Sequence, residues 1–151
     1  MTRDEINQFS KRIAQSNKTQ LVVVTYEIIV NYLDTAVESD SDRDYIYNLQ
    51  KAQQFLNNLT SALDYSYEIS YDLLSLYSYA NRCITMSIAK KENCDLDMVK
   101  NMMLKLKESF DKISREDESG SVMKNADTVY AGITYGKGSL NEMTEPGSTY
   151  N

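Results

Sequence analysis

Few side chains in this sequence are of types that carry out chemistry, and the clearest group is an acidic run ending at Asp44. Asp40, Asp42 and Asp44 alternate with other polar residues, a spacing that suits calcium ligands. An EF-hand loop also needs a glycine and a distal glutamate at fixed offsets, and neither is present. The run is rich in residues that cap helices. We therefore expect it to connect two helices and to form the acidic first turn of the second.

Catalytic groups of the common kinds are missing. The sequence contains no histidine, which removes Ser-His and Cys-His catalysis and the Glu-x-x-His ligands of carboxylate-bridged metal bundles. The Gly-Lys-Gly-Ser run at residues 136–139 lacks the preceding strand that a phosphate-binding loop requires. Cys83 and Cys94 are too few for a disulfide framework, and we interpret them as reduced thiols. We expect no enzyme, no metal and no cofactor.

Charge and hydropathy narrow the class of partner. The net charge of −6 disfavours binding to a phosphate backbone, so nucleic acid is not expected as a partner. No apolar run reaches the roughly 18 residues that a membrane span needs, and no apolar signal segment opens the chain. We therefore expect a cytosolic protein without membrane insertion, whose function is to bind other proteins.

Residues 19–37 are the segment best suited to such binding, because they carry more apolar side chains than one buried helix face uses. One apolar stripe has the period of a core-facing helix, and a second lies about 115° away around the helix. The first stripe comprises Val22, Tyr26, Ile29, Leu33 and Ala36; the second comprises Leu21, Val24, Ile28 and Tyr32. Gln20, Glu27, Asn31, Asp34 and Glu38 are expected to form a solvated face. The second stripe either packs inside the molecule or forms a groove for a partner, and periodicity leaves both open.

The elements that would position this stripe are helices, because the first 119 residues contain neither glycine nor proline. A capping box at Thr2 and Glu5 predicts a short helix over residues 3–15, and Asn17 with Gln20 caps the helix that follows. Leucines and an alanine spaced three and four apart predict a third helix over residues 43–63. The fold class predicted is all-α, an antiparallel up-and-down four-helix bundle with a short N-terminal helix and an extended C-terminal tail.

Two further apolar seams complete the bundle. The fourth helix has the seam Ile69, Leu73, Leu76, Ala80, Cys83 and Ser87, flanked by Leu74, Tyr77, Ile84 and Ile88. The fifth, opened by Asp95, has the seam Leu96, Val99, Met103, Leu106, Phe110 and Ile113. Residues 1–118 are therefore expected to form one domain, with a cap helix in residues 1–16 and four long helices in residues 18–116.

Residues 119–151 differ in composition, since they contain every glycine of the chain and no sustained period. Such a terminus is flexible by default. The alternative is that it docks on the bundle as an extended strap through Val129, Tyr130, Ile133 and Tyr135.

A set of short motifs in a fixed order carries a resemblance to a known family. They are Gln-Leu-Val-Val at residues 20–23, Tyr26-Glu27, Tyr32-Leu33, Lys-Ala-Gln at residues 51–53, and Leu-Tyr-Ser-Tyr at residues 76–79 followed by Arg82. Over residues 17–114 the chain resembles the FliS family of bacterial flagellin export chaperones.

The resemblance implies a four-helix bundle that holds the disordered C-terminal segment of flagellin in a hydrophobic groove, prevents its premature polymerisation in the cytosol and aids its secretion. Other flagellar export components are further candidate partners. The resemblance also implies that the N-terminal segment covers part of the groove, here through Ile6 and Phe9, until flagellin displaces it. We predict the following partner-binding residues: Leu21, Val24, Ile28, Leu74, Tyr77, Asn81, Arg82 and Ile88.

A second hypothesis needs no client. The surplus apolar stripe would then be the interface of a self-associating structural or adaptor bundle, and light scattering of the isolated protein would distinguish the two.

Overall fold

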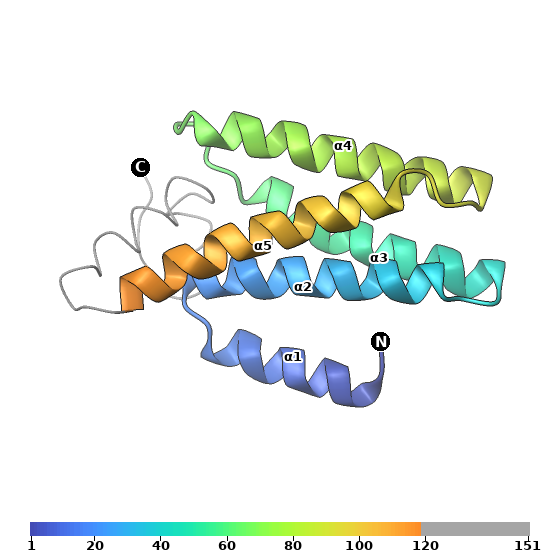
Figure 1. Ribbon diagram of the computed structural model, residues 1–151, viewed down its shortest axis with the longest axis horizontal. Helices are drawn as coiled ribbons and strands as arrows, with labels where there is room; N and C mark the ends of the chain where they lie inside the picture. Colours follow the sequence, from blue (N-terminus) through green and yellow to red (C-terminus); the bar gives the residue numbers. More distant parts are fainter. Residues whose placement is uncertain (119–151) are drawn as a thin grey trace.

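The computed structural model describes residues 1–118 (Figure 1). The predicted tail and its strap residues, Val129, Tyr130, Ile133 and Tyr135, lie outside the described residues. Within the described part the chain is all-helical and contains no strand, as the glycine-free sequence predicts. The helices are α1 (Arg3–Gln15), α2 (Lys18–Val37), α3 (Asp42–Ser61), α4 (Ile69–Lys90) and α5 (Leu96–Glu118).

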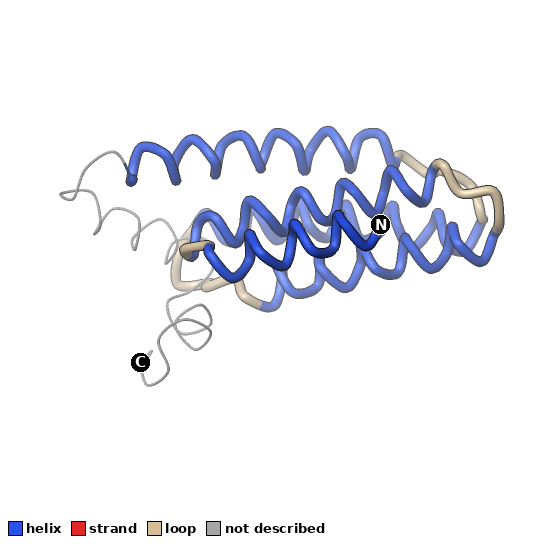
Figure 2. Tube along the Cα trace, turned by 90° about the horizontal axis from the view of Figure 1, so that it is seen from below, coloured by secondary structure: helices blue, strands red, loops and turns tan. Residues whose placement is uncertain are grey.

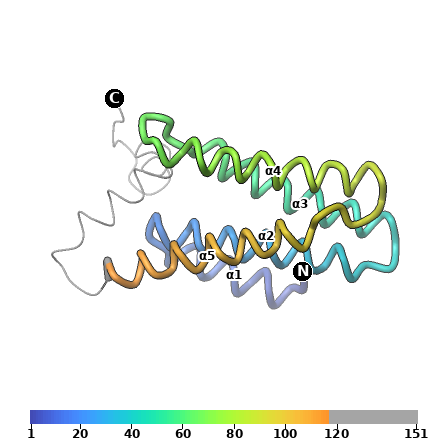
Figure 3. The backbone as a smooth tube through the Cα atoms, turned by 45° about the horizontal axis from the view of Figure 1, so that its top comes forward, coloured from blue at the N-terminus to red at the C-terminus, as the bar shows by residue number. Residues whose placement is uncertain are grey.

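The four long helices form an antiparallel bundle in two layers. α2 packs extensively on α5 and on α3, while α4 completes the bundle by packing on α3 and α5. The α3–α4 layer and the α2–α5 layer are seen together in Figure 3. α1 lies outside this bundle, alongside α2 and on the side away from α4, and Figure 2 shows it in front of the bundle from that side.

Local capping explains where the helices begin. The Thr2 hydroxyl accepts a hydrogen bond from the Glu5 N–H at 3.2 Å, and the Glu5 carboxylate accepts one from the Thr2 N–H at 2.6 Å. Asn17 and Gln20 form the same reciprocal pair at the start of α2, at 2.8 and 3.0 Å. Both boxes satisfy backbone donors that a helix start leaves without intrahelical partners. The two caps predicted from the sequence are confirmed.

The first stripe of α2 faces the core, as predicted. Ile29 and Tyr26 have no exposed surface and Leu33 is 1% exposed. Tyr26 lies against Phe110 of α5, with ring centroids 5.8 Å apart, and its hydroxyl is 2.6 Å from that of Tyr77 on α4. This buried pair of hydroxyls connects the two helices that lie diagonally across the bundle.

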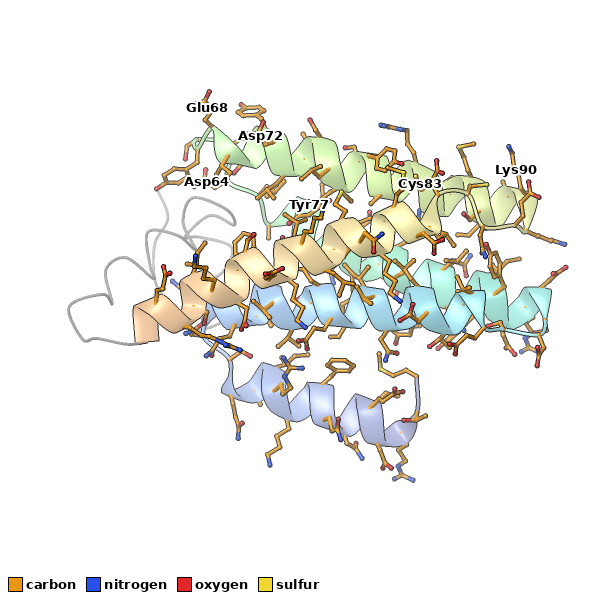
Figure 4. All side chains as sticks on the ribbon, in the orientation of Figure 1. Asp64, Glu68, Asp72, Tyr77, Cys83 and Lys90 are labelled. Atoms are coloured by element: carbon orange, nitrogen blue, oxygen red, sulfur yellow. The ribbon has the colours of Figure 1, made fainter. Side chains whose placement is uncertain are left out.

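The predicted core face of α4 is partly wrong. Ile69 and Leu76 were placed in its seam but are 43% and 37% exposed, whereas Tyr77 and Ile84 are almost fully buried. The apolar surface of α4 is wide enough for several rotations about the helix axis. The rotation adopted buries the larger Tyr77 ring and gives its hydroxyl a partner in Tyr26. Figure 4 shows Tyr77 on the side of α4 that faces the other helices.

Within the described residues, no helix is long and apolar enough to span a membrane.

Candidate client-binding face

The second stripe of α2 is divided among different neighbours. Val24 and Ile28 are only 2% and 3% exposed, yet neither belongs to the cluster of buried side chains that forms the bundle core. Tyr32 turns towards α3 and stacks on Phe55, with centroids 6.0 Å apart, and Leu21 is half-buried. Something other than the four-helix core must therefore cover Val24 and Ile28.

We infer that this cover is α1, which packs against α2 and whose Arg12 lies beside the same pocket as Val24. The Arg12 guanidinium pairs with the Glu27 carboxylate, and the Asn31 side-chain amide donates to the Glu5 carboxylate at 3.3 Å. Glu27 and Asn31 lie three residues beyond Val24 and Ile28, so at 100° per residue all four share one face of α2. This face points about 170° away from the core stripe by the same geometry. We call Val24, Glu27, Ile28 and Asn31 the α1 seat.

The seat corrects one prediction. Glu27 and Asn31 were expected on a solvated face of α2, but both contact α1 and both are half-buried. The sequence signal for this contact was the spacing of Glu27 and Asn31, because the two polar residues alternate with Val24 and Ile28 along one face of α2. Such alternation is ambiguous without knowledge of α1, since a polar residue beside an apolar one fits either solvent or a partner that pairs with it.

Glu27 joins three helices. One carboxylate oxygen pairs with Arg12 of α1, and the other pairs with Lys107 of α5 at 3.2 Å. The Glu27 side chain is 19% exposed, so these contacts are partly shielded from solvent. Release of α1 would remove the Arg12 contact and leave the Lys107 contact between α2 and α5.

α1 contributes little burial of its own. None of its residues is fully buried, since Phe9 is half-buried while Ile6 and Ile13 are 47% and 40% exposed. Arg12 lies 5.9 Å from the centre of the Phe9 ring, which holds both side chains near the seat. A helix of 13 residues is marginal by itself in water. α1 therefore depends on a small set of contacts with α2.

The N-terminal end of α1 depends on an ionised carboxylate. The pKa of Glu5 is lowered from 4.5, chiefly by the hydrogen bond from the Thr2 backbone and then by the one from the Asn31 side chain. The carboxylate form of Glu5 therefore supports both the cap of α1 and its contact with α2.

The contact between α1 and α2 is imperfect at two points. The Asn31 side-chain oxygen is buried and makes no hydrogen bond within the described residues. At the other end of α1, a pocket of about 290 Å³ lies between Arg12, Val23, Val24 and Asp111. The seat thus has an unsatisfied acceptor and free space next to Val24 while α1 occupies it.

The predicted residues of α4 lie elsewhere. Leu74 and Ile88 are half-buried and pack against the core, and the Asn81 side-chain oxygen accepts a hydrogen bond from Gln53 of α3 at 2.8 Å. Tyr77 is 1% exposed, so we assign it to the core. Arg82 is exposed beside the Tyr79 ring. α4 lies across the bundle from α1, so these residues and the α1 seat belong to one site only if a client extends around the molecule.

The described residues include no group of three or more His, Cys, Asp or Glu side chains that could hold a metal ion. Cys83 is buried and Cys94 is half-buried, and both are free thiols. The arrangement is suited to binding an apolar segment by exchange with α1.

Comparison with known proteins gives one result. The sequence model of the family described as flagellar protein FliS matches residues 3–117, which includes α1 and almost all of α5. No curated protein and no solved structure gives a significant match. FliS is a family of flagellar export chaperones with a helical-bundle fold, and it is not a family of enzymes. Because the match covers most of the chain and agrees with the bundle described above, this protein belongs to the FliS family.

Proposed function

We propose that this protein binds the disordered C-terminal segment of flagellin in the bacterial cytosol and keeps it from polymerising before export. The α1 seat would receive part of that segment after α1 leaves. The observation that supports this proposal is the burial of Val24 and Ile28 outside the bundle core, under a helix without a fully buried residue. A bundle whose surplus apolar face is covered only by a marginal helix has a binding surface that can be exposed without unfolding.

The size of the client supports an extended site. A segment that folds on binding typically buries about 1,000 to 3,000 Å² and loses about 2 to 5 kcal/mol to ordering. The α1 seat alone offers a few side chains, so the client should continue beyond it. Leu21, half-buried at the start of α2, extends the apolar surface, and Ile6 and Phe9 of α1 act as the cap that the client replaces. The half-buried or exposed residues predicted on α4, which are Leu74, Asn81, Arg82 and Ile88, would form a more distant part of the site.

Substitution of the seat tests the proposal. Val24→Glu and Ile28→Glu place a carboxylate where a client side chain would pack, and should weaken flagellin binding at least about thirtyfold, as loss of a central apolar contact does. Binding is measured by titration calorimetry with purified monomeric flagellin of the same organism, and helix content by the circular-dichroism melt.

Val37→Glu at the end of α2 is the matched control, because it makes the same Val-to-Glu change at a residue that is 46% exposed and lies outside the α1 seat. Loss of flagellin binding with an unchanged melt, in the seat variants alone, supports the proposal. Unfolding of the seat variants would assign Val24 and Ile28 to the core and rule the seat out. Equal loss in Val37→Glu would mean that charge, not the seat, decides binding.

The self-associating bundle is the alternative. In this alternative the surplus apolar stripe of α2, which includes Val24 and Ile28 outside the bundle core, forms the interface between two copies of the chain. Light scattering of the isolated protein separates the two functions, because a stable dimer that buries the α1 seat would leave no open surface for flagellin.

A further inference from the structure

Glu27 constrains what can replace α1. Its two carboxylate oxygens have separate cations, Lys107 from α5 and Arg12 from α1. When α1 leaves, Lys107 remains and the other oxygen loses its cation. A purely apolar client that covered the seat would then hold a partly paired carboxylate away from water, which is unfavourable. A client with a basic side chain at this position would restore the pairing.

Asn31 adds an independent requirement. Its amide nitrogen donates to Glu5 at 3.3 Å, while its oxygen is buried and makes no hydrogen bond within the described residues. The opposite orientation of the amide would put its oxygen against the Glu5 carboxylate, so α1 cannot satisfy the acceptor by a flip. A buried acceptor without a donor lowers the stability of the contact that buries it. A segment that donates a hydrogen bond to the Asn31 oxygen should therefore bind the seat better than α1 does.

We infer that the flagellin segment which displaces α1 carries, on its apolar face, a basic side chain that pairs with Glu27 and a hydrogen-bond donor that reaches the Asn31 oxygen. This inference rests on the proposed function and specifies the chemistry of the client at that site. The client matches the Arg12 contact of α1 and supplies the donor that α1 lacks. The competition between α1 and the client for the seat is then decided at the Glu27 carboxylate and the Asn31 oxygen, within an otherwise apolar contact.

The effect of the cap must first be separated from that of the client. Arg12→Gln removes the cation of α1 and leaves the seat intact, so it favours the open protein. An exposed or partly exposed pair of this kind changes an equilibrium up to about fivefold. Because apparent affinity scales with the fraction of competent protein, Arg12→Gln should tighten flagellin binding by up to about that factor.

The decisive variants are made in the Arg12→Gln background, where α1 no longer uses Glu27. Glu27→Gln should then weaken flagellin binding about tenfold, because it removes a charged partner of the client. Asn31→Ala is made with Glu5→Ala added to this background, because Asn31 also contacts Glu5 of α1, and should weaken binding about fivefold through loss of the acceptor. Asp34→Asn is the matched control: it makes the same acid-to-amide change on α2, at a carboxylate that pairs with Lys100 of α5 at 2.7 Å.

Binding is measured with purified monomeric flagellin of the same organism, and each variant is checked by its helical melt. Weakening by Glu27→Gln and Asn31→Ala, with Asp34→Asn unchanged, supports the inference. If neither seat variant weakens binding, or Asp34→Asn weakens it equally, the inference is wrong while the proposed function stands. If the Arg12→Gln protein does not bind flagellin at all, the proposed function fails, and the inference with it.

Discussion

The apolar side chains on the two faces of α2 are buried to nearly the same extent but for different reasons. The core face, with Tyr26, Ile29 and Leu33, is apolar throughout and packs on three other helices, and the one polar group described there, the Tyr26 hydroxyl, lies 2.6 Å from a partner. The α1 seat alternates apolar and polar side chains and contacts the short helix α1, with Lys107 of α5 at its edge. Burial alone therefore does not distinguish a permanent contact from an exchangeable one. The two kinds of contact differ in whether their buried polar atoms have hydrogen-bond partners and in how many helices cover them.

Adjacent isoleucines offer the strongest test of this comparison. Ile29→Ala leaves a cavity in the core and should lower the free energy of unfolding by about 2 to 5 kcal/mol. Ile28→Ala should cost less, because Ile28 lies outside the bundle core and the expected loss is limited to what α1 docking contributes. Urea denaturation followed by circular dichroism measures both. Equal losses would mean that the two faces of α2 belong to one cooperative core.

The buried tyrosine pair tests whether the two hydroxyls at the core face of α2 stabilise the protein through their contact with each other. Tyr26→Phe and Tyr77→Phe should each destabilise the protein by about 1 kcal/mol, the net worth of a hydrogen bond. The double variant should lose less than the sum, because the second change no longer breaks the contact between the two hydroxyls. Denaturation of the four proteins completes the cycle. Strict additivity would show that the 2.6 Å contact is not energetically coupled.

Lowering the pH should weaken the docking of α1 on its seat before it destabilises the core face of α2. The pKa of Glu5 is lowered in the folded protein, first by the Thr2 backbone, so ionised Glu5 stabilises docked α1 above pH 4.5. This contribution is lost as the pH falls below 4.5 through the folded pKa. Hydrogen-exchange protection of α1 should then decrease relative to α5. The Glu5→Gln variant should lack this step, and its persistence there would assign the pH dependence to another group.

The sequence predicted the helices correctly, but it did not predict the rotation of α4 about its own axis. The capping boxes at Thr2 and Asn17 are local, so α1 and α2 begin where their residues predict. The seam of α3 has one narrow apolar stripe, and Leu49, Ala52 and Leu56 are fully buried. α4 has a wide apolar face, and periodicity therefore placed Leu76 in the core where the structure has Tyr77. The Tyr26 hydroxyl that pairs with Tyr77 lies across the bundle, and a pattern along one helix does not include it.

The candidate site also has some features that the sequence predicted and others that only the tertiary structure decided. The lack of glycine and proline in the first 119 residues predicted the helices, and the surplus stripe of residues 19–37 predicted a binding surface, which stays a prediction. The family motifs lie in the same sequence. Only the tertiary structure decided that Val24 and Ile28 lie under α1, that Tyr32 faces α3, and that Glu27 and Asn31 contact α1. The physical reason is that helical period determines which residues share a face, whereas the neighbour that covers the face depends on contacts between segments distant in sequence.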